Sequence, residues 1–146
     1  MRTGRTPDRG EWRVCRAVHV ADTDEQARRE ALEGALGRDY RDYFLPLLGQ
    51  SRGLGGLKME ESMPDSALTL DYLCDNVWLV GSPETVARKI RELYAAVDGF
   101  GSIVIGATDW SDPAIWERSM DLFATEVAPR VADLGAPAAV SAGGRP

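Results

Sequence analysis

The stretch 81–105 reads GSPETVARKIRELYAAVDGFGSIVI and predicts a helix followed by a strand. Ser82 is a favourable helix N-cap, Pro83 suits the first helical position, and Glu84 complements the positive end of the helix dipole. Apolar side chains then recur with helical spacing up to a glycine, a residue that commonly ends helices. The apolar, β-branched run SIVI at 102–105 is typical of a strand buried on both faces, as in a parallel sheet.

A second strand-then-helix unit lies upstream. Residues 11–21, EWRVCRAVHVA, alternate with the period of two that predicts a β-strand. Its bulky side chains fall on one face and its mostly small ones on the other: Val14, Arg16, Val18 and Val20 against Cys15, Ala17, His19 and Ala21. Thr23 and Gln26 fit a capping box, so a helix is expected to run from there toward residues 40–44 and to end before Pro46.

The remaining segments are less regular. Four glycines and Pro64 in residues 46–68 predict an insertion without regular structure, either a functional lid or a disordered loop. Residues 69–80 are expected to form a short helical turn and then an extended stretch. Asp112, followed by a proline, opens another helix, whose apolar repeat reaches Val127 and which is expected to end at Pro129.

The length of 146 residues suits one folded domain, expected over 11–134 between a flexible lead-in at 1–10 and a disordered tail at 135–146. The 23 acidic residues against 17 basic ones give a net charge of −6, which argues against binding to nucleic acid or anionic membranes. No apolar run approaches the roughly 20 residues of a membrane span, and no signal peptide is expected at the start.

Cys15 and Cys74 do not form a closely spaced metal-binding pair. With a single histidine, the chain offers too few Cys and His ligands for zinc, so no metal site is predicted. We expect two reduced, buried thiols in a cytoplasmic protein, a single disulfide being the alternative.

The order of predicted elements is strand, helix, insertion, helix, strand, helix. This alternation predicts the α/β class, built from parallel βα units. Two strands are too few for a closed barrel or a stable open sheet, so the chain is expected to be part of a larger architecture.

Three blocks of the sequence resemble luciferase-like flavin-dependent monooxygenases, the family of bacterial luciferase and limonene monooxygenase-like enzymes. The blocks read WRVCRAVHVADTDEQAR at 12–28, VGSPETVARKIRELYAAVDGFGSIVIGATDW at 80–110 and RSMDLFATEVAPRV at 118–131. They are similar to the C-terminal part of that family, and the resemblance covers about residues 9–134.

The resemblance implies a (β/α)8 barrel that binds reduced FMN, activates dioxygen and oxygenates a small organic substrate, while a flavin reductase supplies the reduced cofactor. Residues 11–21 would form the seventh strand and 102–107 the eighth. Such a barrel needs about 250 residues, so the expected fold is a partial TIM barrel: its C-terminal βα units with the inserted loop. The first six strands, which carry most of the flavin pocket in that family, are missing. We therefore expect weak or no flavin binding and no turnover by this chain alone.

Four residues are candidates for the site of such an enzyme. His19 lies near the end of its strand, where TIM-barrel active sites open, and could hydrogen-bond flavin, peroxide or substrate. The alternatives are a bond to a backbone carbonyl, or a side chain that is simply exposed because half of the barrel is missing. Gly106 could let a ligand approach the backbone, Thr108 could bind a phosphate oxygen, and Trp110 could stack on a planar ligand. Helix capping, relief of crowding and closure of the core are the alternatives at these last three positions.

Two other patterns do not point to catalysis. Ser82 and Glu84 are explained as a helix cap and a first-turn acid, and the glycines at 53–56 lack the spacing of a dinucleotide-binding loop. A function of a different class remains open: a non-catalytic accessory or interaction protein, whose exposed strand edges pair with a second copy or with a complementary chain.

Overall fold

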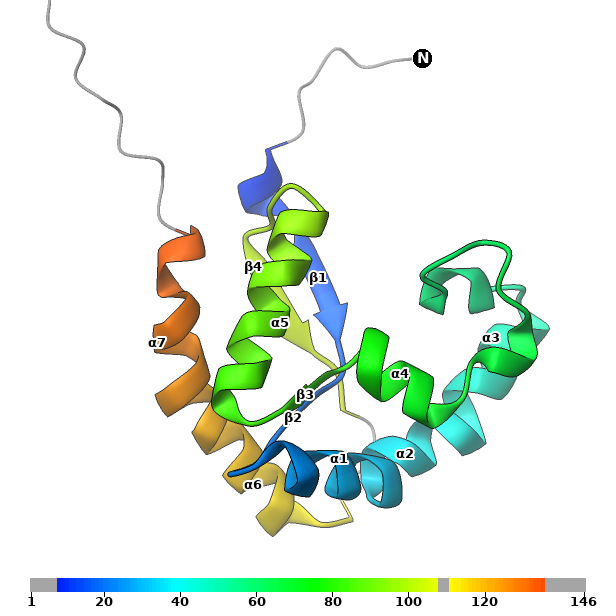
Figure 1. Ribbon diagram of the computed structural model, residues 1–146, viewed down its shortest axis with the longest axis horizontal. Helices are drawn as coiled ribbons and strands as arrows, with labels where there is room; N and C mark the ends of the chain where they lie inside the picture. The colour runs from blue at the N-terminus through cyan, green and yellow to red at the C-terminus, as the bar shows by residue number, and fades with distance from the viewer. Residues whose placement is uncertain (1–7, 108–110, 136–146) are drawn as a thin grey trace, which may run out of the picture.

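The computed structural model describes residues 8–107 and 111–135, in which helices surround two short pairs of parallel strands (Figure 1). The strands are β1 (Arg13–Arg16), β2 (Val18–Val20), β3 (Leu79–Gly81) and β4 (Ser102–Ile105). The helices are α1 (Asp24–Glu33), α2 (Ala35–Asp39), α3 (Leu45–Gln50), α4 (Leu70–Asn76), α5 (Pro83–Ala96), α6 (Pro113–Leu122) and α7 (Ala128–Val131). Short 3-10 turns occupy Arg9–Glu11, Leu54–Leu57, Asp65–Ala67 and Ala132–Gly135, and π-helical turns occupy Tyr40–Phe44 and Phe123–Val127.

The strands β1 and β2 are two parts of the single strand predicted over 11–21, interrupted at Ala17. β1 pairs in parallel with β4, and β2 pairs in parallel with β3. The N–H of Gly106 donates to the carbonyl of Arg16 at 3.3 Å, and the N–H of Leu79 donates to the carbonyl of Ala17 at 2.9 Å. Consecutive carbonyls of an extended chain point to opposite sides, so β4 and β3 flank the central strand on opposite edges.

Two apolar clusters cover the two faces of β2 and β3, as the predicted alternation requires. The first cluster, here the α1–α4 cluster, contains Ala17, Ala21, Ala27, Ala31, Leu68, Leu73, Cys74, Trp78 and Val80. The second, the α5 cluster, contains Val18, Val20, Leu79, Val86, Ala87, Ile90, Phe100 and Val127. Figure 1 shows α5 and the α6–α7 helices beside one another on the side of the second cluster. All residues of β2 and β3 are buried as a result.

The strand β4 is not buried on both faces, and here the sequence-based expectation is wrong. Ile103 and Ile105 pack against the α5 cluster, but Val104 is 44% exposed. Val104 pairs in register with Cys15, which is also exposed and is a free thiol, so the expectation that both thiols are buried holds only for Cys74. The described helices cover one face of β1 and β4 and leave the other open.

The predicted helix starts are confirmed. The side chains of Thr23, Ser82 and Asp112 each accept a hydrogen bond from the backbone N–H three residues further along the chain. This satisfies one of the donors that a helix N-terminus leaves without an intrahelical partner. The capping box at Thr23 is only half formed, because the Gln26 side chain donates to Glu30 instead.

Two predicted helix ends are wrong. The helix that starts at Asp24 breaks at Gly34 but resumes and continues past Pro46, and the last helix continues past Pro129. Both prolines lie in the first turn of a helical segment that follows a π-helical turn. A proline supplies no N–H to the helical ladder, and each of these prolines lies just after a π-helical turn, where the regular ladder is already interrupted.

The insertion at 46–68 carries more structure than predicted. It contains most of α3 and two 3-10 turns, and Leu54, Leu57 and Met63 pack against the α1–α4 cluster. The helical turn and extended stretch expected over 69–80 are observed as α4 and β3. The insertion therefore covers part of the core, while Met59 projects from it at 70% exposure.

The predicted lead-in and tail fall mostly outside the described residues, which exclude 1–7, 108–110 and 136–146. Within the described part, Asp8 caps the turn Arg9–Glu11, and Gly135 ends the last turn. None of the helices in these ranges is long and apolar enough to cross a bilayer.

Candidate functional site

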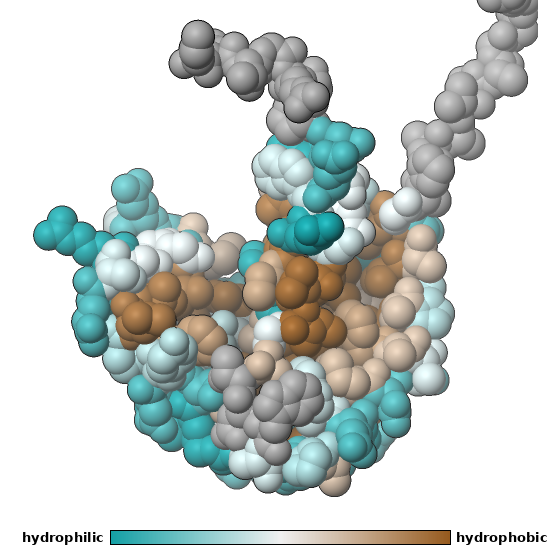
Figure 2. Space-filling view, turned by 180° about the vertical axis from the view of Figure 1, so that it is seen from behind, coloured by the Kyte–Doolittle hydropathy of each residue, from teal (hydrophilic) through white to brown (hydrophobic). Residues whose placement is uncertain are grey.

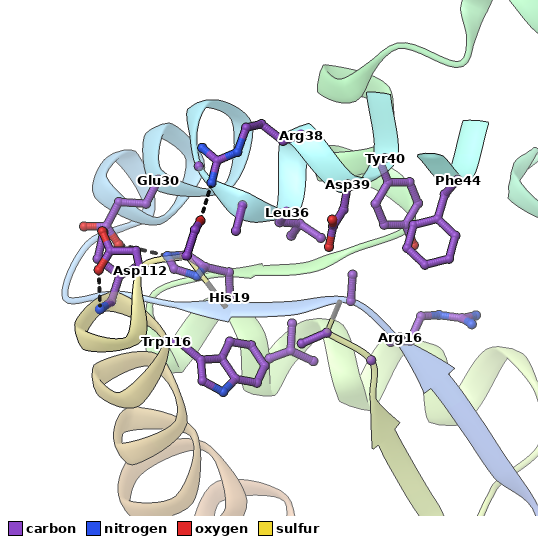
Figure 3. A pocket seen from close by; sticks show the side chains of 18 of the residues that line it. Arg16, His19, Glu30, Leu36, Arg38, Asp39, Tyr40, Phe44, Asp112 and Trp116 are labelled. Carbon is purple, nitrogen blue, oxygen red and sulfur yellow. Dashed lines mark hydrogen bonds and ion pairs between the residues drawn. The ribbon is translucent and has the colours of Figure 1, made fainter. Parts of the chain in front are cut away.

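A cavity of about 520 Å³ lies beside β2 and the carboxyl end of β4, between α1–α2 and α6 (Figure 3). Its apolar lining includes Leu36, Tyr40, Phe44, Ile115 and Trp116. Its polar lining includes Arg16, His19, Glu30, Arg38, Asp39, Ser111 and Asp112. Figure 3 shows His19 and Glu30 at one end of the cavity and Tyr40 and Phe44 at the other. The volume and the mixture of an apolar lining with a few polar groups are those of a small-molecule pocket.

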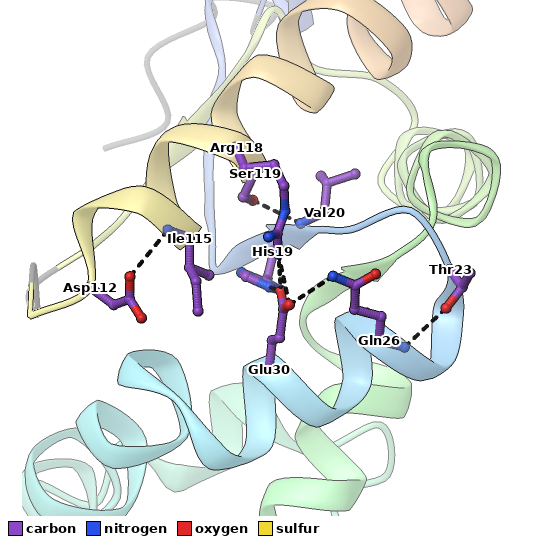
Figure 4. Close-up of polar contacts among 9 residues, drawn as sticks. All are labelled: His19, Val20, Thr23, Gln26, Glu30, Asp112, Ile115, Arg118 and Ser119. Carbon is purple, nitrogen blue, oxygen red and sulfur yellow. Dashed lines mark hydrogen bonds and ion pairs between the residues drawn. The ribbon is translucent and has the colours of Figure 1, made fainter.

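His19 is buried, with 7% of its surface exposed, and it lines the cavity from β2. Its Nε2 atom lies 2.9 Å from Oε2 of Glu30 (Figure 4). Of the alternatives open for His19, the structure therefore shows a carboxylate partner rather than a backbone carbonyl. The period-two alternation brings His19 to this face, and α1 brings Glu30 against it.

The Glu30 carboxylate is held by two further side chains. Gln26, one turn earlier on α1, donates to Oε1 at 2.9 Å. The guanidinium of Arg118 on α6 lies 2.7 Å from both Glu30 oxygens. Burial raises the pKa of Glu30, but the hydrogen bonds from Gln26, His19 and Arg118 outweigh it and hold the pKa below its ordinary value. Glu30 is thus a carboxylate that accepts from all three partners.

A buried hydroxyl fixes α6 beside the strand and so positions Arg118. Ser119, which is fully buried, accepts a hydrogen bond from the backbone N–H of Val20 at 2.8 Å (Figure 4). Such a bond satisfies a strand donor at the point where β2 has no ladder partner on that side. Ser119 and Arg118 are adjacent in sequence. The bond between Ser119 and Val20 therefore holds α6 in the position from which Arg118 contacts Glu30.

A second polar junction lies outside the cavity and ties α1 to the start of α5. Asp24 accepts from the backbone N–H of Ser82 at 2.7 Å and from the hydroxyl of Thr85 at 2.9 Å. These bonds, the first above all, outweigh burial and hold the pKa of Asp24 below its ordinary value. Ser82 therefore serves the helix cap and this junction, which agrees with the rejection of a catalytic serine.

Only some of the predicted site residues can be placed. His19 and Gly106 both line the cavity. A Cβ added at Gly106 would lie 3.6 Å from Sγ of Cys15, an ordinary contact, so the described residues do not themselves require glycine there. Thr108 and Trp110 lie outside the described residues.

The sequence reasoning missed Glu30 and Arg118. Glu30 stands beside Ala31 on the inward stripe of α1, and an acid at the border of an otherwise apolar stripe is the signal that could have pointed to it. Arg118 lies 88 residues further along the chain, and no local pattern joins the two. In the described ranges, no group of three or more His, Cys, Asp or Glu side chains is arranged to hold a metal ion.

Parallel βα units with a cavity beside the ends of the strands define the class of structure: an α/β unit that carries a ligand pocket. No family model matches the chain. The chain is 37% identical over 132 residues to 3,6-diketocamphane 1,6-monooxygenase of Pseudomonas putida, covering 90% of this chain and 35% of that enzyme. It is 31% identical over 135 residues to limonene 1,2-monooxygenase of Rhodococcus erythropolis, covering 90% and 32%.

The structure is similar to that of the oxygenating constituent of 3,6-diketocamphane monooxygenase from Pseudomonas putida, a type II Baeyer-Villiger monooxygenase in complex with FMN. The TM-score is 0.78 at 38% sequence identity, covering 87% of this chain and 35% of that one. The resemblance predicted from the sequence is confirmed: the chain is a homologue of luciferase-like, FMN-dependent monooxygenases. It spans about a third of the length of the curated relatives it matches, as a C-terminal portion would.

Proposed function

We propose that this chain forms the C-terminal βα units of an FMN-dependent monooxygenase barrel and contributes one wall of its active site. The observation that carries the proposal is the cavity that His19 and Gly106 line beside β2 and the end of β4. TIM-barrel enzymes place their active sites at the carboxyl ends of the strands. The remaining strands would come from polypeptide that corresponds to the other two thirds of the relatives.

The described residues fit part of FMN. Leu36, Tyr40 and Trp116 give the cavity apolar surface that suits a flavin ring or an organic substrate. The flavin phosphate does not fit at the α6 N-terminus, because the carboxylate of Asp112 already caps it and accepts from the N–H of Ile115 at 3.3 Å. Weak flavin binding by the chain alone is expected, because most of the proposed barrel corresponds to the unmatched two thirds of the relatives.

The chemistry of the complete enzyme would be oxygen transfer. Reduced FMN, when bound, activates dioxygen so that one oxygen atom is transferred to an organic substrate. His19 would hold a hydrogen-bonding ring nitrogen against the reacting molecules, and the apolar wall would exclude water from them. Gly106 at the end of β4, with Thr108 and Trp110, remains a proposed flavin contact.

We propose the partners and location that this chemistry needs. A flavin reductase would supply reduced FMN, and the relatives named for diketocamphane and limonene suggest a cyclic terpenoid or a similar small organic substrate. Two free thiols suit a cytoplasmic protein.

Flavin fluorescence quenching tests the proposal. The chain is titrated into FMN alone and together with a polypeptide that corresponds to the unmatched two thirds of the Pseudomonas putida relative. We expect weak quenching with the chain alone and saturable, roughly stoichiometric quenching with the pair. Tight stoichiometric binding of FMN by the chain alone would contradict the proposal that the chain contributes only one wall of the site. Absence of FMN binding by the pair of polypeptides would contradict the proposed function.

A second function is favoured by one observation, the open face of β1 and β4. Cys15 and Val104 are exposed there, and Figure 2 shows apolar surface gathered in a hollow of this side of the molecule. A non-catalytic protein that covers this face by self-association or with a complementary chain would bury that surface. Sedimentation separates the candidates, because a monomer at all concentrations would contradict self-association.

A further inference from the structure

The ring nitrogens of His19 have different environments. Nε2 contacts Glu30, whereas Nδ1 has no hydrogen-bond partner among the described residues. Nδ1 is not sealed from solvent either, because the unpaired and sealed side-chain polar atoms of the described residues are Trp78 Nε1 and Arg118 Nε. His19 lines the cavity, so the accessible nitrogen is a hydrogen-bonding group offered to whatever occupies it.

The partners of Glu30 determine what Nδ1 can do. An ionised carboxylate only accepts hydrogen bonds, so neutral His19 must carry its proton on Nε2 to make the 2.9 Å contact. Arg118 keeps Glu30 ionised and oriented, because it contacts both oxygens at 2.7 Å. In the neutral imidazole, Nδ1 is then left without a proton and is a hydrogen-bond acceptor.

The cavity beside His19 is lined by apolar surface and by charged side chains, among them Arg16, Arg38 and Asp39. Leu36, Ile115 and Trp116 line the cavity with apolar surface, and the charge of Glu30 is already balanced by Arg118. A ligand that fills about 520 Å³ and meets Nδ1 must bring its own hydrogen-bond donor, since an acceptor placed there would leave two lone pairs facing one another.

We propose that Glu30 and Arg118 are positioning residues that fix His19 in the Nε2–H tautomer. The cavity therefore selects a ring molecule that donates an O–H or N–H to Nδ1. This inference rests on the proposed function only in treating the cavity as a ligand site. The donor could belong to the hydroxyl of an organic molecule or to the ring N–H of a flavin.

The single histidine makes the tautomer directly measurable. Histidine-selective ¹⁵N labelling and a two-bond ¹H–¹⁵N spectrum at pH 8.5 report which ring nitrogen carries the proton. We expect the Nε2–H form in the unmodified chain and in Glu33→Leu, an exposed position on the same helix. We expect the Nδ1–H form to become populated in Glu30→Leu. A dominant Nδ1–H form in the unmodified chain would overturn the proposal.

Two matched pairs of probes test the ligand class and separate its sources. Borneol and camphor share one bicyclic skeleton and differ as alcohol and ketone, while lumiflavin and 3-methyllumiflavin differ in one ring N–H. We expect the donor of at least one pair to bind about three- to tenfold more tightly than its mate, the effect of one hydrogen bond, and to shift the Nδ1 resonance. Preference within the first pair identifies an organic hydroxyl, and preference within the second identifies the flavin edge.

Equal binding within both pairs, or tighter binding of the ketone and the methylated flavin, would overturn the donor assignment. His19→Leu should abolish the preference, and the unmodified chain alone decides the question if that variant does not fold. These readouts need neither bound FMN nor turnover. The donor assignment can therefore fail while the chain and its complementary polypeptide bind FMN together. It can also hold while that pair does not bind FMN.

Discussion

The two halves of the central strand are covered differently. β2, with its neighbour β3, lies between the α1–α4 cluster and the α5 cluster, and every residue of both strands is buried. β1, with its neighbour β4, alternates exposed and partly buried residues, because the described helices cover only one of its faces. The neighbouring strands β4 (SIVI) and β3 (LVG) are both apolar in sequence, so composition alone does not decide which of them is enclosed.

This difference in burial distinguishes the part of the chain that forms the core from the part that presents surface to other molecules. The β2–β3 half provides the core and the polar contacts around Glu30. The β1–β4 half presents apolar surface that a closed barrel would turn inward. Under the proposed function, this surface would face the polypeptide that corresponds to the unmatched two thirds of the relatives.

Thiol accessibility gives the largest expected contrast between the halves. Cys15 is exposed in β1, whereas Cys74 is 3% exposed in the α1–α4 cluster and burial raises its pKa. A maleimide should therefore label Cys15 at least about 100-fold faster than Cys74, which must wait for local opening of the structure. Mass spectrometry of the two peptides over time measures the ratio, with Cys15→Ser as the control; similar rates would mean that the halves are not distinct.

The same substitution in each half should have unequal effects on stability. Val20 in β2 is fully buried, while Val104 in β4 is 44% exposed. Val20→Ala should lower the free energy of unfolding by about 2 kcal/mol, because it removes buried methyl groups and leaves a cavity. Val104→Ala should change it by less than about 0.5 kcal/mol. Urea denaturation measures both, and equal losses would show that the β4 face is covered in solution.

The carboxylate of Glu30 should matter more than an exposed one. Glu30→Gln should cost about 1–2 kcal/mol, since Glu30 is 14% exposed and its contact with Arg118 is partly shielded from water. Glu92→Gln, which breaks the exposed pair with Arg88, should cost only a few tenths of a kcal/mol. Equal losses of stability in the two variants would show that Glu30 contributes no more to folding than an exposed carboxylate does.

The smallest effect is the acid dependence of stability. The pKa values of Glu30 and Asp24 are lowered in the folded chain, so their contribution is present above their unfolded values near about pH 4 and is lost as the pH falls through the folded values. The free energy of unfolding should therefore decrease on acidification. Denaturation from pH 7 to pH 3 should show a shallower decrease for Glu30→Gln; an unchanged slope would contradict the assignment.

Local patterns predicted the helix starts and the strand alternation well. The caps at Thr23, Ser82 and Asp112 depend on atoms three residues apart, and the two faces of 11–21 depend only on backbone geometry. The predicted helix ends at Pro46 and Pro129 failed because a π-helical turn before each proline depends on packing. His19 and Gly106 were predicted to lie at one site, and both line the cavity.

The sequence by itself determined the parallel βα order and the kinship with flavin-dependent monooxygenases, because both are carried by short runs of adjacent residues. Only the tertiary structure joined His19 to Glu30 across 11 residues and Glu30 to Arg118 across 88. Only the tertiary structure, too, left one face of β4 open. Long-range contacts and burial depend on how separate segments pack, which no local pattern encodes.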